Sequence, residues 1–154
     1  MAIQIGDKIP EILGKDQDGK LVRTGDYFGK KIVLYFYPKD STPGCTEEAC
    51  SFRDNYNTML QKGYEVLGVS VDSAKSHKRF IGKNALPFNL ISDEEHELVD
   101  LFGVWGEKKM AGHKYMGIFR TTFLFNEKGI LEQIINPKSI KTKEHATQIL
   151  EIKQ

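Results

Sequence analysis

Residues 31–62 read KIVLYFYPKDSTPGCTEEACSFRDNYNTMLQK, and this stretch decides the fold. Its first seven residues, Lys31–Tyr37, are apolar and aromatic after the initial lysine and stop at Pro38, which is typical of a strand buried on both faces. After a segment rich in helix breakers, the residues from Thr46 to about Gly63 are expected to form one helix. A buried strand that leads into a helix indicates an α/β architecture.

The sequence on either side continues the alternation of strands and helices. The expected elements are a hairpin around Glu11–Thr24, a strand Tyr64–Val71, a helix Ala74–Asn84, a short strand Phe88–Ile91, a helix from Asp93 to about Phe102, a long loop Gly103–Phe119, a hairpin of Thr121–Phe125 with Ile130–Ile135, and a closing amphipathic helix from Thr142. This order predicts an α/β sandwich with a mixed central sheet flanked by helices.

The length and charge of the chain exclude several classes of protein, including nucleic-acid-binding and membrane-spanning proteins. The 154 residues are expected to form a single domain, 1–154, with 40% hydrophobic and 28% charged residues. The net charge is +1, from 22 basic and 21 acidic residues, so neither a nucleic acid nor a membrane surface is an expected partner. No signal-peptide pattern opens the chain, and the longest apolar run is too short to cross a bilayer. We therefore expect a cytoplasmic protein, in which paired cysteines are more often catalytic or metal-binding than structural.

The only two cysteines, Cys45 and Cys50, lie within this stretch. Because Pro43 and Gly44 end the breaker-rich segment, Cys45 is expected at or just before the start of the helix. Free backbone N–H groups and the positive end of the helix dipole favour a thiolate there. A sulfur nucleophile with a second thiol five residues later is a redox arrangement.

Two neighbours of Cys45 fit a site for an oxygen electrophile. The Thr42 hydroxyl, three residues earlier, can hold a substrate in line, and Pro38 can shield the sulfur from water. Each also has a structural explanation, because Pro38 can simply end the strand and Thr42 can cap the helix. Glu47 and Glu48 in the first helical turn oppose thiolate formation, so a reactive Cys45 requires a nearby cation.

The spacing of the cysteines makes a mechanical prediction. Residues five apart on an α-helix have Cα atoms roughly 8–9 Å apart and side chains that point about 140° apart. A disulfide requires a Cα separation of about 7 Å or less. A Cys45–Cys50 disulfide is therefore expected to form only if the start of the helix unwinds, with Pro43 and Gly44 as the hinge.

The segments PKDSTPGCTEEACSFRD (38–54) and GVWGEKKMAGHKYMGIFRTTFLF (103–125) resemble the peroxiredoxins, specifically the bacterioferritin-comigratory-protein or PrxQ subfamily. The resemblance covers nearly the whole chain. It implies a thioredoxin-like fold with an N-terminal hairpin extension. It also implies reduction of hydrogen peroxide and organic hydroperoxides without metal, flavin or haem, re-reduction by thioredoxin, and a monomer or weak homodimer.

The resemblance also implies roles for individual residues. Cys45 matches the peroxidatic cysteine and Cys50 the resolving one. Pro38 and Thr42 match the active-site loop, and Arg120 matches the active-site arginine. Glu48 matches a position that orients that arginine.

Other functions remain open from the sequence. A thioredoxin-type thiol–disulfide oxidoreductase would share the fold, although the cysteine spacing speaks against it. A redox-sensing or chaperone-like binding module could use the same disulfide. A metal site is not expected, because the four histidines show no ligand-like spacing with the cysteines. Of these, His77 and His96 are expected to be solvated helix residues and His113 a surface loop residue; the fourth is His145.

Overall fold

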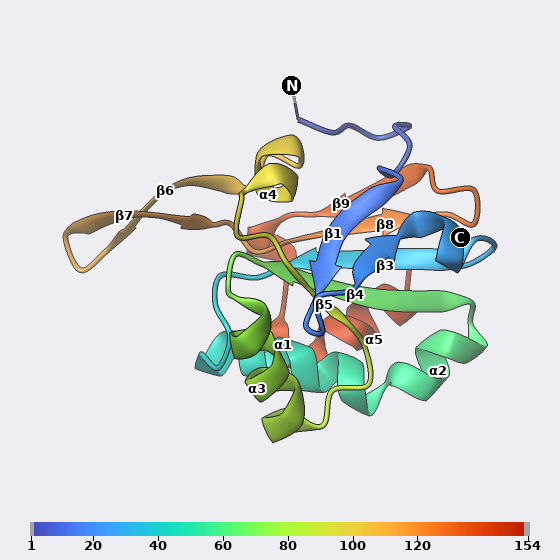
Figure 1. Ribbon diagram of the computed structural model, residues 1–154, viewed down its shortest axis with the longest axis horizontal. Coiled ribbons are helices and arrows are strands. Elements are labelled where there is room, and N and C mark those ends of the chain that lie inside the picture. The colour runs from blue at the N-terminus through green and yellow to red at the C-terminus, as the bar shows by residue number, and fades with distance from the viewer. Residues whose placement is uncertain (1, 153–154) are drawn as a thin grey trace.

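A seven-stranded mixed sheet forms the centre of the computed structural model, which describes residues 2–152 (Figure 1). The strand order is β2-β1-β5-β4-β3-β8-β9. The strands are β1 (Ile12–Asp16), β2 (Leu21–Arg23), β3 (Lys31–Phe36), β4 (Tyr64–Ser70), β5 (Leu90–Ser92), β8 (Thr121–Phe125) and β9 (Leu131–Ile135). β3, β4 and β5 run parallel, whereas β8 pairs antiparallel with β3. The predicted mixed α/β sandwich is confirmed.

Helices cover both faces of this sheet. The helices are α1 (Pro43–Asp54), α2 (Tyr56–Gln61), α3 (Ala74–Asn84), α4 (Glu97–Leu101) and α5 (His145–Leu150), with short 3₁₀ turns at Thr24–Tyr27, Pro137–Ser139 and Thr142–Glu144. Successive residues of β3 alternate between two apolar clusters. One cluster contains Phe52 of α1 and Phe80 of α3, and the other contains Val99 of α4. Because both faces are buried, the β3 sequence is apolar without interruption.

Several expected elements differ from the structure; the helix expected from Asp93 to about Phe102, for example, is confined to α4, Glu97–Leu101. The helix expected from Thr46 to about Gly63 is divided at Asn55 into α1 and α2. The loop expected at Gly103–Phe119 is instead a two-stranded antiparallel hairpin of β6 (Trp105–Met110) and β7 (His113–Ile118). This hairpin is not part of the central sheet and projects from the body of the molecule (Figure 1).

The N-terminal hairpin forms as expected, and it is part of the main sheet. β1 pairs with β2 and also with β5, so the hairpin extends one edge of the sheet. The closing helix is shorter than expected, because its first residues form the 3₁₀ turn Thr142–Glu144. Within residues 2–152, no helix has the length and apolar character needed to cross a membrane.

Candidate active site

The pairing of β3 with β8 brings Cys45 and Arg120 to the same end of the sheet. Phe36, the last residue of β3, lies opposite Thr121, the first residue of β8. The chain leaves β3 through Pro38 toward Cys45, and Arg120 directly precedes β8. Two residues 75 positions apart in the sequence therefore meet at this edge.

The helix begins at Pro43, earlier than the expected start, so Cys45 is the third residue of α1 and lies within its first turn. Thr42 is the N-cap and has an extended backbone, and Pro43 occupies the first helical turn. The Cys45 side chain is buried, with 2% exposed. It thus lies beside the free N–H groups of a helix start, which favour a thiolate. Because the side chain is buried, a charged sulfur there also requires a cation close by.

Thr42 and Pro38 lie in the loop before Cys45 and are both half-buried. The Thr42 hydroxyl makes no capping hydrogen bond to the helix. It donates instead to the carbonyl oxygen of Lys39 at 2.8 Å. The hydroxyl oxygen keeps its lone pairs for a further donor.

α1 begins at Pro43 and its first turn holds no acidic residue, so Glu47 and Glu48 lie beyond that turn rather than in it. Arg120 is the cation expected near these two carboxyl groups and Cys45. One guanidinium nitrogen, Nη2, donates to the Cys45 sulfur at 3.3 Å, and the other, Nη1, donates to Glu48 Oε1 at 2.6 Å. A side chain at Gly44 would crowd this arrangement, because its Cβ would lie 3.3 Å from Nη2. The guanidinium is thus held between a carboxyl group and the sulfur.

Burial sets the charge state of the Glu48 carboxyl group. The pKa of Glu48 is raised to about 7, mainly because burial disfavours the charged form, while Arg120 opposes this shift by charge and hydrogen bonding. Burial would lower the pKa of Arg120, but the charges of Glu48 and Cys45 outweigh it, and the net shift is upward. Arg120 therefore stays charged, whereas Glu48 titrates near neutral pH.

Behind Glu48 lies His145, a buried residue that the sequence did not single out as part of the site. Its Nδ1 faces Gln148 Oε1 at 3.0 Å and its Nε2 faces the Thr122 hydroxyl at 2.7 Å. Burial, with a contribution from Arg120, lowers the pKa of His145 to about 4, although the Gln148 bond acts in the opposite direction. The ring is neutral at pH 7, donates from Nδ1 to Gln148 and accepts from Thr122. The only hint in the sequence is its place four residues before the buried Ile149, on the apolar side of the closing helix.

His77 is fully buried, so the expectation of a solvated helix residue was wrong. Its Nδ1 lies 2.7 Å from Asp40 Oδ2, and its Nε2 donates to the carbonyl oxygen of Ile91 at 3.0 Å. Tyr37 donates to the other Asp40 oxygen at 2.6 Å. This network fastens the loop that precedes Cys45 to α3 and β5.

Asp40, Asp72 and His77 have ligand-type atoms within 4.8 Å of one another. These atoms are already engaged, since Asp72 Oδ2 accepts from the Asp40 backbone N–H at 2.9 Å and from Ser70 Oγ at 2.7 Å. A cation would have to replace these hydrogen bonds. We therefore assign the cluster a structural role.

Cys50 lies about one and a half turns further along α1, with a free, half-buried thiol. Its sulfur is 4.0 Å from Asn84 Oδ1, at the end of α3. Cys45 is also a free thiol, and the helix between them is intact. This is the arrangement that the spacing argument requires of the reduced protein.

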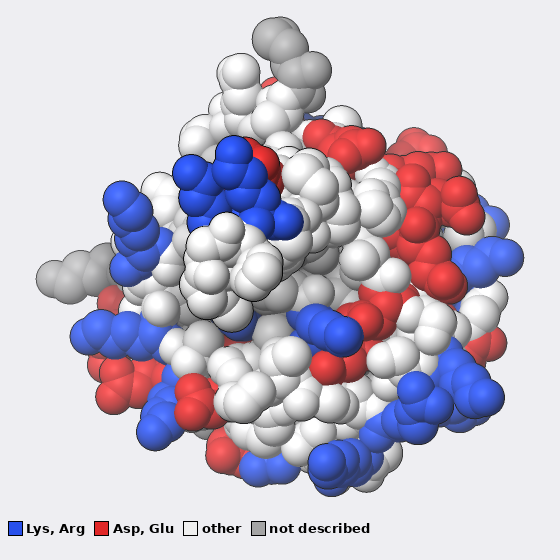
Figure 2. Space-filling model, turned by 90° about the vertical axis from the view of Figure 1, so that its left-hand side faces the viewer, with Lys and Arg blue, Asp and Glu red and all other residues white. Residues whose placement is uncertain are grey.

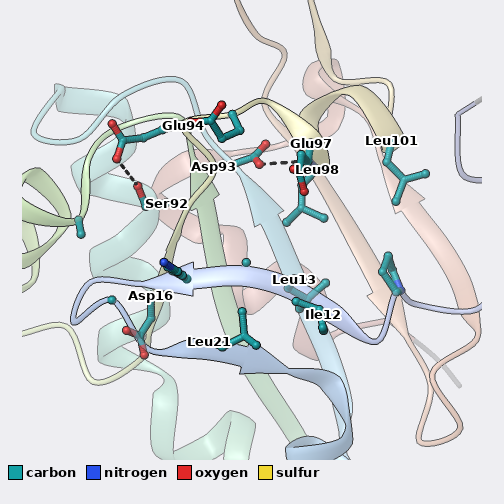
Figure 3. A pocket seen from close by; sticks show the side chains of 16 residues that line it. Ile12, Leu13, Asp16, Leu21, Ser92, Asp93, Glu94, Glu97, Leu98 and Leu101 are labelled. Atoms are coloured by element: carbon teal, nitrogen blue, oxygen red, sulfur yellow. Dashed lines mark hydrogen bonds between the residues drawn. The ribbon is translucent and has the colours of Figure 1, made fainter.

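A pocket of about 550 Å³ lies elsewhere, between the β1–β2 hairpin and the segment that leads into α4 (Figure 3). None of the six candidate site residues lines it. The Asp93 carboxylate on its wall accepts hydrogen bonds from the backbone N–H groups of Leu98 and Val99, so it caps α4. The chemistry at Cys45 does not involve this pocket.

Comparison with known proteins agrees with this geometry. The model of the AhpC/TSA family matches residues 5–134. The chain is 46% identical over 151 residues to peroxiredoxin Bcp of Bacillus subtilis (98% of this chain, 95% of the relative). It is 41% identical over 148 residues to peroxiredoxin Bcp of Escherichia coli K12 (96% and 94%).

Solved structures give the same answer for the fold. A mutant of PrxQ from Xylella fastidiosa superposes with a TM-score of 0.86 at 33% identity, covering 97% of this chain and 94% of that one. The bacterioferritin comigratory protein of Xanthomonas campestris, studied for its alkyl peroxide reduction activity, superposes with a TM-score of 0.81 at 35% identity, covering 94% and 95%. The fold is thus thioredoxin-like. The chain belongs to the AhpC/TSA family and, within it, to the peroxiredoxins of the Bcp/PrxQ group.

Proposed function

We propose that this protein is a thiol-dependent peroxidase that reduces hydrogen peroxide and organic hydroperoxides at Cys45. The observation that carries the proposal is the position of the Arg120 guanidinium, which donates to the Cys45 sulfur while Glu48 holds its other nitrogen. A buried thiolate with a fixed cation beside it is suited to attack on an O–O bond. The related Xanthomonas protein is studied for alkyl peroxide reduction.

The first step oxidises the sulfur by two electrons. The Cys45 thiolate attacks the terminal oxygen of the hydroperoxide, an S–O bond forms and the O–O bond breaks. The leaving alkoxide takes a proton and becomes an alcohol, or water when the substrate is hydrogen peroxide. Thr42 and Arg120 polarise the breaking bond, and Pro38 limits access of water. Cys45 becomes a sulfenic acid.

The second step requires movement of the start of α1. The Cys50 thiol attacks the sulfenic sulfur, a disulfide forms and water leaves, but only after the turns between the two cysteines unwind. Unwinding breaks the hydrogen bond from the Thr142 hydroxyl to Glu47 Oε2 (2.9 Å). The bond from the Ala146 N–H to Ser51 Oγ (3.0 Å) lies one residue beyond Cys50 and need not break. We therefore expect the movement to end before Ser51.

The cycle closes when an external dithiol reduces the disulfide by exchange. We assign this role to thioredoxin, with the chain acting in the cytoplasm as a single domain, 1–154, and as a monomer or weak homodimer. The test is hydrogen peroxide consumption coupled to NADPH oxidation through thioredoxin and thioredoxin reductase. Mass spectrometry of the peroxide-treated protein should find a Cys45–Cys50 disulfide. Absence of both turnover and disulfide would reject the proposal.

Glu48→Gln is expected to change the pH dependence of the first step. Below pH 7 the Glu48 carboxyl is mostly neutral, as the amide is, and the two proteins should react alike. Above pH 7 Glu48 ionises and its negative charge opposes the thiolate, whereas glutamine stays neutral. The ratio of the variant's rate to the native rate should therefore rise from about one at pH 6 to about threefold or more at pH 8.

The measurement is the second-order rate of Cys45 oxidation by hydrogen peroxide, taken by stopped flow at pH 6, 7 and 8. Glu97→Gln, an exposed change on α4, is the matched control and should show a constant ratio. A ratio for Glu48→Gln that does not vary with pH would contradict the assigned titration.

Thr142→Val is expected to speed disulfide formation. Valine keeps the shape of threonine but removes the hydrogen bond that holds Glu47 to the 3₁₀ turn. Loss of one such bond should raise the rate of the second step by about threefold and leave the first step unchanged. Rapid-quench thiol labelling after peroxide addition measures both steps. Thr147→Val, an exposed change on α5, serves as control, and equal rates in all three proteins would show that this bond does not restrain α1.

A further inference from the structure

We propose that the projecting hairpin, residues 105–118, is the docking surface for the protein dithiol that reduces the Cys45–Cys50 disulfide. This inference rests on the proposed function and adds the place where the reductant binds. We call the hairpin the arm; it consists of β6, β7 and the turn between them.

The arm exposes apolar side chains that the rest of the described chain does not cover. Eight large hydrophobic side chains are exposed in residues 2–152, and four of them lie on the arm or directly after it. These are Met110 (67% exposed), Met116 (55%), Tyr115 (41%) and Phe119 (36%). A two-stranded hairpin on its own is only marginally stable in water. Met110 and Tyr115 share one face of the arm, and this face is the candidate contact surface.

One face of the arm leads directly to the active site. Lys108 pairs with Tyr115 across the two strands, and side-chain alternation puts Met110 on the same face. The Lys108 ammonium lies 6.0 Å from the ring centres of both Tyr115 and Phe119. Phe119 directly precedes Arg120 in the chain, so the base of this face lies next to the residue that contacts Cys45.

Lys108 fastens the base of this face. Its Nζ donates to the carbonyl oxygen of Ile118 at 2.8 Å. The pKa of Lys108 is lowered, first by partial burial and then by the charge of Arg120, while Cys45 acts in the opposite direction. The arm base therefore lies within electrostatic range of the reactive sulfur.

The chemistry of the arm describes the partner. Thiol–disulfide exchange requires the partner's sulfur to approach the Cys45–Cys50 disulfide in line, so the partner has to bind next to this end of the sheet, where the arm begins. The arm carries three lysines and one glutamate, which favours a partner with an acidic, partly apolar face around its own reactive cysteine. In Figure 2 the end of the molecule that bears the arm faces the viewer, and basic side chains (blue) stand beside uncharged ones (white).

The test compares a protein reductant with a small one. The wild type and its variants are first oxidised to the Cys45–Cys50 disulfide with hydrogen peroxide. Each is then mixed with reduced thioredoxin or with dithiothreitol, and acid quench with thiol labelling gives the rate of reduction. Met110→Ser/Tyr115→Ser alters the face that leads to the site. Met116→Ser, on the opposite face, is the matched control.

With thioredoxin, Met110→Ser/Tyr115→Ser should be reduced about tenfold more slowly than the wild type, and Met116→Ser within about twofold of it. With dithiothreitol all three should react alike. Added salt should slow reduction of the wild type by thioredoxin but not by dithiothreitol.

The inference would be overturned if thioredoxin reduced the double variant at the wild-type rate, or if the double variant were slowed equally with both reductants. It would also be overturned if the wild type were a dimer, the double variant were a monomer, and thioredoxin reduced both at the same rate. The last would make the arm a contact between copies of this chain. Failure of the proposed function is distinguishable, because it appears in the wild type as absence of the disulfide before any variant is compared.

Discussion

Cys45→Ser is expected to abolish peroxide consumption, because the hydroxyl of serine is not ionised at neutral pH and cannot replace the thiolate that attacks the O–O bond. The change removes one buried sulfur and leaves Glu48, the other hydrogen-bond partner of Arg120, in place. The thioredoxin-coupled assay should fall to the background rate. Serine is close to cysteine in size, so circular dichroism should show a folded protein.

Cys50→Ser is the control that separates the two steps. This variant should consume one equivalent of peroxide at the native rate and then stop, with a Cys45 sulfenic acid that dimedone traps. Full thioredoxin-coupled turnover by Cys45→Ser would contradict the assignment of Cys45. Continued turnover by Cys50→Ser would contradict the intramolecular disulfide.

Arg120→Met is expected to slow the first step by about a hundredfold. Methionine fills part of the same space but gives neither the donor at 3.3 Å from the Cys45 sulfur nor the positive charge beside it. The substitution also leaves the buried Glu48 without its partner, which favours the neutral form of that carboxyl group. The measurement is the second-order rate of Cys45 oxidation by hydrogen peroxide.

Arg79→Met, which removes an exposed arginine from α3, is the matched control and should react like the native protein. Arg120→Lys separates charge from geometry, because lysine keeps the charge but cannot reach the sulfur and Glu48 with two nitrogens at once. Its rate should fall between those of Arg120→Met and the native protein. An Arg120→Met rate within about threefold of native would remove Arg120 from the mechanism.

Much of the fold could be predicted because burial leaves a direct mark on the sequence. The apolar runs that became β3 and β4 are covered on both faces, so no alternation interrupts them. The arm was not predicted, because little of it is buried. Both of its faces are largely exposed, so residues 105–118 show no apolar alternation, and glycines at 106, 112 and 117 suggest a loop.

Only the part of the candidate site that is close together in the sequence, around Cys45, could be predicted from the residues themselves. The position of Cys45 at a helix start follows from Pro43 and Gly44, and the need for a cation follows from the adjacent acidic residues. Arg120 was assigned through the family resemblance, because its approach depends on the pairing of β3 with β8. The burial of His77 and His145 depends on partners in distant segments, and no local pattern encodes such hydrogen bonds.

The division of the long helix at Asn55 has a thermodynamic consequence. Helix formation is cooperative along an unbroken run of hydrogen bonds, so a break fixes the size of the cooperative unit. Here the unit that contains both cysteines is 12 residues long, and the six residues of α2 form a separate one. Formation of the disulfide is therefore expected to unwind only part of this short helix, while the sheet and α2 keep their packing. If α1 unwinds as we propose, we expect the rest of the fold to remain folded through each cycle.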